Sequence, residues 1–275
     1  MKPLPVALMT GAVGIAAITL DNPLWPTAAA LAGGLLLTAA GPPRRIYAAF
    51  AILTGLTVFL LEPFVAVQGL TTLWRGPDIP ILDTQITTEE LAYGAVAGLR
   101  IAATALAAGA FVRLADSDLL LRAVARVAPR SAMIASLTTQ MLPALERDAA
   151  GVLVAARTRA AAVSRPGTAA RLTGPLVGMS LERALAVAEA MEARGYAGPT
   201  RSAAPVRGLS ARERVLTLLG TAALAIVLVA VATGAGDFRY FDLLGDPWTP
   251  AAIAGAAGLA VLAAAFAWVV VRWRP

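Results

Sequence analysis

Two arginines, each near the end of a helical segment, are the residues best placed for chemistry in this 275-residue sequence. Arg157 follows Ala156, and 37 positions later Arg194 lies between Ala193 and Gly195. A guanidinium group is always charged and presents a planar fork of donors, so it can bind carboxylates and backbone carbonyls of a partner. The pattern therefore favours binding to another protein over catalysis.

The neighbours of each arginine decide how it is presented. A small alanine lets two surfaces approach closely, and Gly195 permits the left-handed backbone that ends a helix, so that Arg194 can project from the tip. Thr158 follows Arg157 instead of a glycine, so we expect a different helix ending there. A purely structural interpretation also stays open, because an arginine at the negative end of a helix before a glycine cap is common.

The composition excludes most catalytic sites. The chain has no cysteine and no histidine, which removes thiolate metal sites, cysteine nucleophiles and the commonest general base. It contains neither a GxxxxGK[ST] loop nor a dinucleotide fingerprint. Asp116 and Asp118 are the nearest approach to a carboxylate pair for a divalent ion, and helix capping explains their position better. We expect no cofactor, no metal site and no enzymatic activity.

The elements that position the arginines belong to a membrane protein. Hydrophobic residues make up 58% of the chain, charged residues 15%, and the mean hydropathy is +0.72. A helix needs about 20 residues to cross the hydrocarbon layer. The sequence predicts an all-α, polytopic membrane protein of about six transmembrane helices, at Leu4–Leu20, Leu24–Ala40, Ile46 to about Leu70, Leu91–Val112, Val215–Gly234 and about Ala251–Val271. A loop rich in turn formers is expected after the third span.

The distribution of cations predicts the orientation. Lys and Arg near span ends are retained on the cytoplasmic side, and six spans put both termini there, in the cell membrane. Fifteen arginines then fall in the cytoplasmic segment 113–214, and only Arg75 and Arg239 lie outside. The basic pI of about 10.6 is explained by this bias and by anionic lipid, so we expect no nucleic acid partner.

The segment 113–214 divides the chain into three predicted regions. Residues 1–112 form a four-span membrane region, 113–214 a cytoplasmic or interfacial region of amphipathic helices, and 215–275 two further spans. Helices are expected from near Ser131 to Ala162 and over Ala169–Arg194. Their apolar faces are predicted at Leu145, Ala149, Val152 and Ala156, and at Leu181, Ala184 or Leu185, Ala188 and Met191.

Two charged residues lie within the apolar runs of neighbouring spans. They are Glu62 and Arg100. Because a charge inside the membrane is costly, we expect a structural ion pair between them, with a snorkelling arginine or a transport-path residue as alternatives. Gly94 and Gly98 form a GxxxG pattern, which is typical of close helix packing.

The residues around Arg194 carry a family resemblance. Ala193-Arg194-Gly195, with the approach from Ser180 to Glu192, resembles the second signature of the T component, the transmembrane coupling subunit of energy-coupling factor transporters. Ala156-Arg157-Thr158 resembles the first signature with threonine in place of glycine. The resemblance implies docking of two ABC ATPase subunits at Arg157 and Arg194, and a substrate-binding membrane S component on the same helices. Vitamin or transition-metal uptake is then expected, with ATP hydrolysed by the partners.

Two other classes of function stay open from the residues alone. A stand-alone permease forming its own substrate path is compatible with six spans and an intramembrane ion pair, but it leaves the arginine-ended helices unexplained. A membrane-embedded enzyme using carboxylates and a divalent ion would require a tight acidic cluster facing the bilayer. Asp116 and Asp118 do not provide one.

Overall fold

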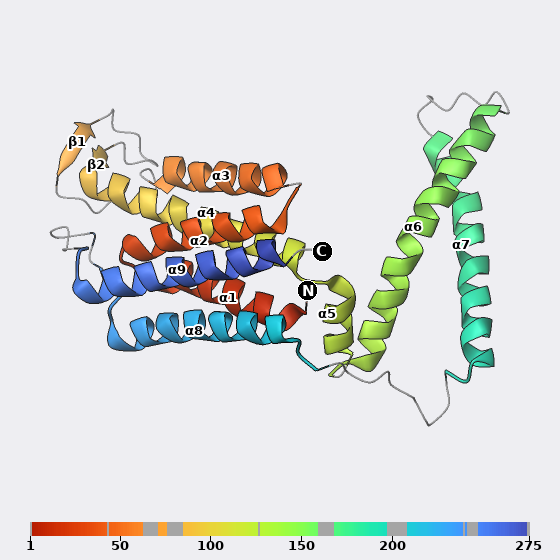
Figure 1. The fold of residues 1–275 in the computed structure, drawn as a ribbon. Coiled ribbons are helices and arrows are strands. Elements are labelled where there is room, and N and C mark those ends of the chain that lie inside the picture. The colour runs from red at the N-terminus through yellow and green to blue at the C-terminus, as the bar shows by residue number, and fades with distance from the viewer. Residues whose placement is uncertain are drawn as a thin grey trace. The chain divides into compact units, whose positions relative to one another are not determined.

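A computed structural model describes residues 2–42, 44–62, 71–75, 85–125, 127–158, 168–196, 208–238, 240 and 247–273. The chain forms two compact units, which are described separately below. The first holds residues 1–120 together with 209–275, and the second holds residues 121–208 (Figure 1).

The first unit is a bundle of six apolar helices, which confirms the predicted all-α membrane class. They are α1 (Pro3–Thr19), α2 (Leu24–Ala40), α3 (Arg44–Leu61), α4 (Thr88–Leu114), α8 (Ala211–Thr233) and α9 (Pro250–Arg272). Among the described residues, α3, α4, α8 and α9 are long and apolar enough to cross a membrane, whereas α1 and α2 are shorter apolar helices of 17 residues each. Helix α3 ends at Leu61, and most of its predicted extension to Leu70 lies outside the described residues.

A short β-hairpin precedes α4 where the sequence predicted only a loop. Strands β1 (Thr72–Arg75) and β2 (Gln85–Thr87) pair antiparallel. Strands of four and three residues carry too little alternation to stand out beside so many turn formers. The hairpin leads directly into α4, where the hydroxyl of Thr87 accepts from the amide of Glu90 and the Glu90 carboxylate accepts from the amide of Thr87.

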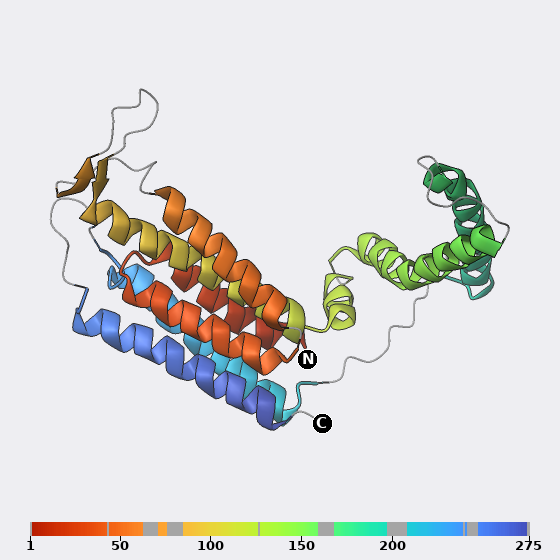
Figure 2. The same cartoon turned by 90° about the horizontal axis from the view of Figure 1, so that it is seen from above.

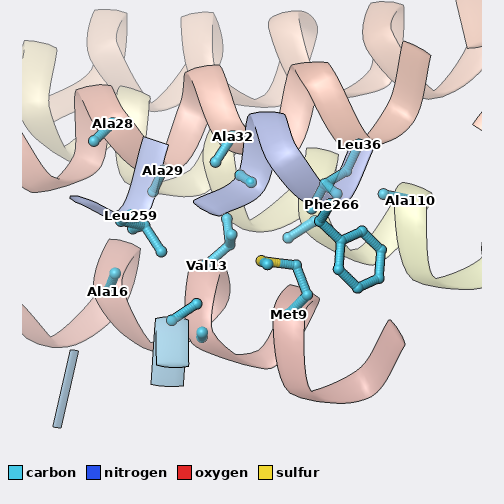
Figure 3. Packing of buried hydrophobic residues seen from close by; sticks show 14 of the residues in the cluster. Met9, Val13, Ala16, Ala28, Ala29, Ala32, Leu36, Ala110, Leu259 and Phe266 are labelled. Carbon is cyan, nitrogen blue, oxygen red and sulfur yellow. The ribbon is translucent and has the colours of Figure 1, made fainter. Parts of the chain in front are cut away.

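The core of the bundle lies around α1 and α2. Helix α2 packs between α4 and α9, and α1 packs against α8 and α4. Figure 3 shows Met9 and Val13 of α1 facing Leu259 and Phe266 of α9, with the alanines of α2 beside them. Buried alanine recurs on every one of these helices, and small side chains let helix backbones approach closely in a membrane protein.

Helix α3 is attached mainly through glycine contacts with α4. A Cβ added at Gly98 would lie 2.5 Å from the carbonyl oxygen of Gly55, so the two backbones touch. Among the described elements, α3 also makes a small contact with α2. Large apolar side chains over the rest of its surface are exposed, among them Ile46, Phe50, Leu53 and Leu60. The bundle is viewed from above in Figure 2.

The second unit is built from α6 (Pro129–Thr158) and α7 (Thr168–Ala193), which run in opposite directions (Figure 1). Before them, α5 (Ser117–Val124) begins as predicted, because the Asp116 carboxylate accepts from the amide of Asp118 at 3.0 Å. Most of the predicted apolar face of α7 is exposed, with Leu181 60% and Leu185 57% exposed. Of that face only Met191 is partly covered, and the other partly covered residues of α7 are Leu176, Ser180 and Val187.

Candidate functional site

The end of α7 has the geometry that its glycine predicts. Gly195 has a φ of +70°, in the left-handed region. Its amide donates to the carbonyl of Glu192 at 2.8 Å, and the amide of Tyr196 donates to the carbonyl of Met191 at 3.0 Å. This pair of hydrogen bonds is the Schellman motif, which satisfies the last carbonyls of a helix. Arg194 is therefore the residue at which α7 stops.

The end of α7 is open among the described residues. Ala193, Arg194, Gly195 and Tyr196 are all exposed, and no atom lies within 4 Å of the position where a Cβ on Gly195 would be. An exposed guanidinium at a capped helix end can enter a recess on a partner, and the cap fixes the backbone from which the side chain projects. The sequence prediction that Arg194 lies at an open helix tip agrees with this geometry.

The end of α6 differs, as Thr158 suggested. Thr158 is still helical, and its hydroxyl donates to the carbonyl of Ala155 at 2.9 Å. Within the described residues α6 has no left-handed glycine after its arginine, so Arg157 lies inside the last helical turn. Ala156 is partly covered, and the side chain of Arg157 is outside the described residues.

The two arginines lie at opposite ends of the helix pair. Asp148 of α6 and Arg183 of α7 form an ion pair of 2.6 Å, which places these residues side by side. Arg157 is nine residues beyond Asp148, and Arg194 is eleven residues beyond Arg183 in the opposite direction. At 1.5 Å per residue these arms measure about 14 Å and 16 Å. The two arginines are thus roughly 30 Å apart along the pair.

The intramembrane arginine has a different partner from the one expected. Arg100 of α4 binds the Asp21 carboxylate at 2.6 Å and the carbonyl of Leu20 at 3.2 Å. Among the described residues no ion pair joins it to Glu62. The sequence offers a signal for this contact, because Asp21 directly follows the apolar run of α1.

The contact between α3 and α4 explains why Glu62 is out of reach. The antiparallel helices meet at Gly55 and Gly98. From there Glu62 lies seven residues toward one end of the bundle, and Arg100 lies two residues toward the other. The resulting axial offset is roughly 13 Å, which is too large for a direct ion pair.

The connection between α8 and α9 covers the same turn. The amide of Asn22 donates to the carbonyl of Gly236 at 2.7 Å, and its side chain donates to the carbonyl of Pro247 at 3.1 Å. The Tyr240 hydroxyl donates to the carbonyl of Asp21. Burial raises the pKa of Tyr240 to about 12, so its hydroxyl stays protonated and can donate up to strongly alkaline pH. These contacts close one end of the bundle.

The described residues contain no group of three or more acidic side chains arranged to hold a metal ion. A family model with the description CbiQ, cobalt transport protein, matches residues 4–205. This range includes both arginine motifs and all helices from α1 to α7. No curated protein matches the chain.

Proposed function

Because the chain belongs to the CbiQ family of cobalt transport proteins, it is a membrane transport component, and we propose a specific role for it. We propose that it is the transmembrane energy-coupling subunit of an importer of the energy-coupling factor type. It would transmit conformational changes of two ABC ATPase subunits to a substrate-binding membrane subunit that carries a transition metal or vitamin. The partners would hydrolyse the ATP, so this chain would have no catalytic residue.

The observation that carries the proposal is the capped end of α7. Arg194 is exposed beside a glycine in the left-handed conformation, with both hydrogen bonds of the Schellman motif formed. A fixed, positively charged helix end suits a recess lined by carboxylates and carbonyl oxygens. The ATPase-docking group would be Ala193, Arg194 and Gly195, with Ala156 and Arg157 as its counterpart on α6.

The separation of the arginines supports two partners. An offset of roughly 30 Å along the helix pair is about the diameter of a small domain, so one compact site cannot bind both residues. The simplest arrangement is that each ATPase subunit binds one of the two arginines. The ending of α6 lacks a described glycine cap, so docking there should be the weaker of the two.

The uncovered face of α7 supports a further partner within the membrane. Val177, Leu181 and Leu185 recur every four residues and are all more than half exposed. Apolar side chains at this spacing form one stripe along a helix, which is typical of a surface that packs against another helix. We assign this stripe to the substrate-binding membrane subunit.

We further propose that both termini lie in the cytoplasm and that the chain resides in the cell membrane. The beginning of α1 and the end of α9 lie at the same end of the bundle, because Lys2 pairs with Glu213 at 3.0 Å and Arg212 donates to the carbonyl of Trp273 at 2.9 Å. Arg113 at that end donates to the carbonyl of Pro42. Basic residues gathered at one end of a bundle favour the cytoplasmic side.

Co-purification in mild detergent tests the proposal. The unaltered chain should bring down an ATPase pair, Arg194→Glu should lose it, and Arg157→Glu should weaken it less. Arg147→Glu is the matched control, because it makes the same charge change at an exposed position near the middle of α6, about 15 Å along the helix from Arg157. Substrate uptake by the purified chain without any ATPase would support a stand-alone permease and exclude the coupling role.

A further inference from the structure

The ion pair between α6 and α7 has no part in the docking proposed above. Arg183 Nη2 lies 2.6 Å from Asp148 Oδ2, with 42% and 18% of the two side chains exposed. Among the described residues of 121–208, no other ion pair joins two helices. The covered positions of both helices around it carry mostly small and apolar side chains.

Those side chains do not define a unique register. The partly or fully covered residues of α6 near the pair include Ala144 and Val152, and those of α7 include Leu176 and Val187. Such positions repeat every three or four residues, so sliding one helix by a turn presents a similar apolar surface to the other. A single polar contact in a repetitive helix interface is a recognised means of selecting one register.

We propose that the Asp148–Arg183 pair sets the register of α6 against α7 and thereby fixes the distance between Arg157 and Arg194. Its meaning for transport rests on the proposed docking function, whereas the register itself is a property of this chain alone. Asp148 and Arg183 are in this view positioning residues, since they act through the spacing of Arg157 and Arg194.

The geometry gives the size of the effect. The arms from the ion pair to the two arginines are about 14 Å and 16 Å and point in opposite directions. A slip of α7 by one helical turn would therefore change their separation by about 5 Å. If both ATPase subunits must bind at the same time, one arginine would then fit its subunit while the other would be displaced by about 5 Å.

The role in register can be separated from a role in folding. A partly exposed ion pair contributes little to overall stability, so its removal should leave the helices formed. The chain has no cysteine, which allows spin labels to be attached only where cysteines are introduced. Thr158→Cys and Glu192→Cys place labels at exposed positions beside the two tips.

The first experiment measures the distance between these labels in the full chain in lipid nanodiscs by pulsed electron spin resonance. The starting protein should give one narrow distribution. Asp148→Asn with Arg183→Gln should add populations displaced by about 5 Å, and the exchange Asp148→Arg with Arg183→Asp should restore the narrow distribution. The matched control is Arg147→Gln with Glu182→Gln, which removes the same charges one position away and should change nothing.

Two results would overturn the proposal. One is an unchanged distance distribution after neutralisation, and the other is an exchanged pair that remains as broad as the neutralised one. Circular dichroism of each variant checks that helix content is retained. If the neutralised variant loses helix content but the exchanged variant keeps it, only the exchanged variant is used for the test. A narrow distribution in that variant supports the proposal, and a broad one overturns it.

The second experiment connects the register to transport in the reconstituted complex. Neutralising the pair should lower substrate uptake per ATP hydrolysed while the ATPases still co-purify, because Arg194 is unaltered. Uptake per ATP equal to that of the starting protein would overturn the consequence for coupling. If no ATPase binds even the unaltered chain, the proposed function fails, and the distance measurement still decides the register.

Discussion

Replacing Gly195 by alanine tests whether the shape of the α7 end matters for docking. Its φ of +70° is in a region that costs an ordinary residue about 1–2 kcal/mol. The added methyl group meets no atom within 4 Å, so the whole effect is backbone strain. If only the capped form docks, a loss of about 1–2 kcal/mol weakens ATPase binding by roughly 5- to 30-fold.

The assay is a titration of the purified ATPase against the chain in nanodiscs. Gly195→Asn should weaken binding less than alanine, because asparagine tolerates the left-handed region better. Gly178→Ala is the matched control: it is the same substitution on the same helix, also with open space, but at a helical position where alanine is favoured. Equal affinities for Gly195→Ala and the unaltered chain would refute the reasoning.

Three further predictions concern the bundle. Gly98→Ala should lower the stability of the bundle by about 1–3 kcal/mol, measured by unfolding in denaturing detergent, because the added Cβ meets the α3 backbone. Gly34→Ala is the control and should not lower it, because its added Cβ meets no atom within 4 Å. Asp21→Ala and Arg100→Ala, alone and combined, should show a coupling energy of about 1 kcal/mol, and additive effects would mean that the pair contributes nothing. The pKa of Tyr240 is raised from 10.0 to about 12, so its protonated hydroxyl stabilises the fold fully below pH 10, and this stabilisation is lost as the pH rises to 12. Tyr240→Phe should therefore remove this part of the fall in melting temperature at alkaline pH.

The sequence predicted the helices well because span length and apolar content are read directly from composition. Helix α2 has the predicted bounds, and α1, α4, α8 and α9 differ by a few residues at each end. The hairpin before α4 was missed because strands of three and four residues leave almost no periodic signal. Local sequence patterns were therefore sufficient to predict elements that contain several repeats of their helix or strand period.

Contacts between helices were harder to predict. The partner of Arg100 depends on where Gly55 meets Gly98, and no local pattern reveals that register. The cap at Gly195, in contrast, is formed within six residues, and the sequence predicted it correctly. On α7 the spacing predicted one apolar face but not what covers it, and Leu181 and Leu185 of that face are exposed, because the largest apolar surface need not face the nearest helix of the same chain.

The attachment of α3 has a consequence for how the protein is made. Its main neighbour, α4, begins only at Thr88, so the ribosome must synthesise more than twenty residues after Leu61 before that contact can start to form. During this interval α3 has, among the described helices made before it, only its small contact with α2. Its apolar surface suits that early stage, and the glycine contact lets α4 dock later without any rearrangement of side chains at the point of closest approach.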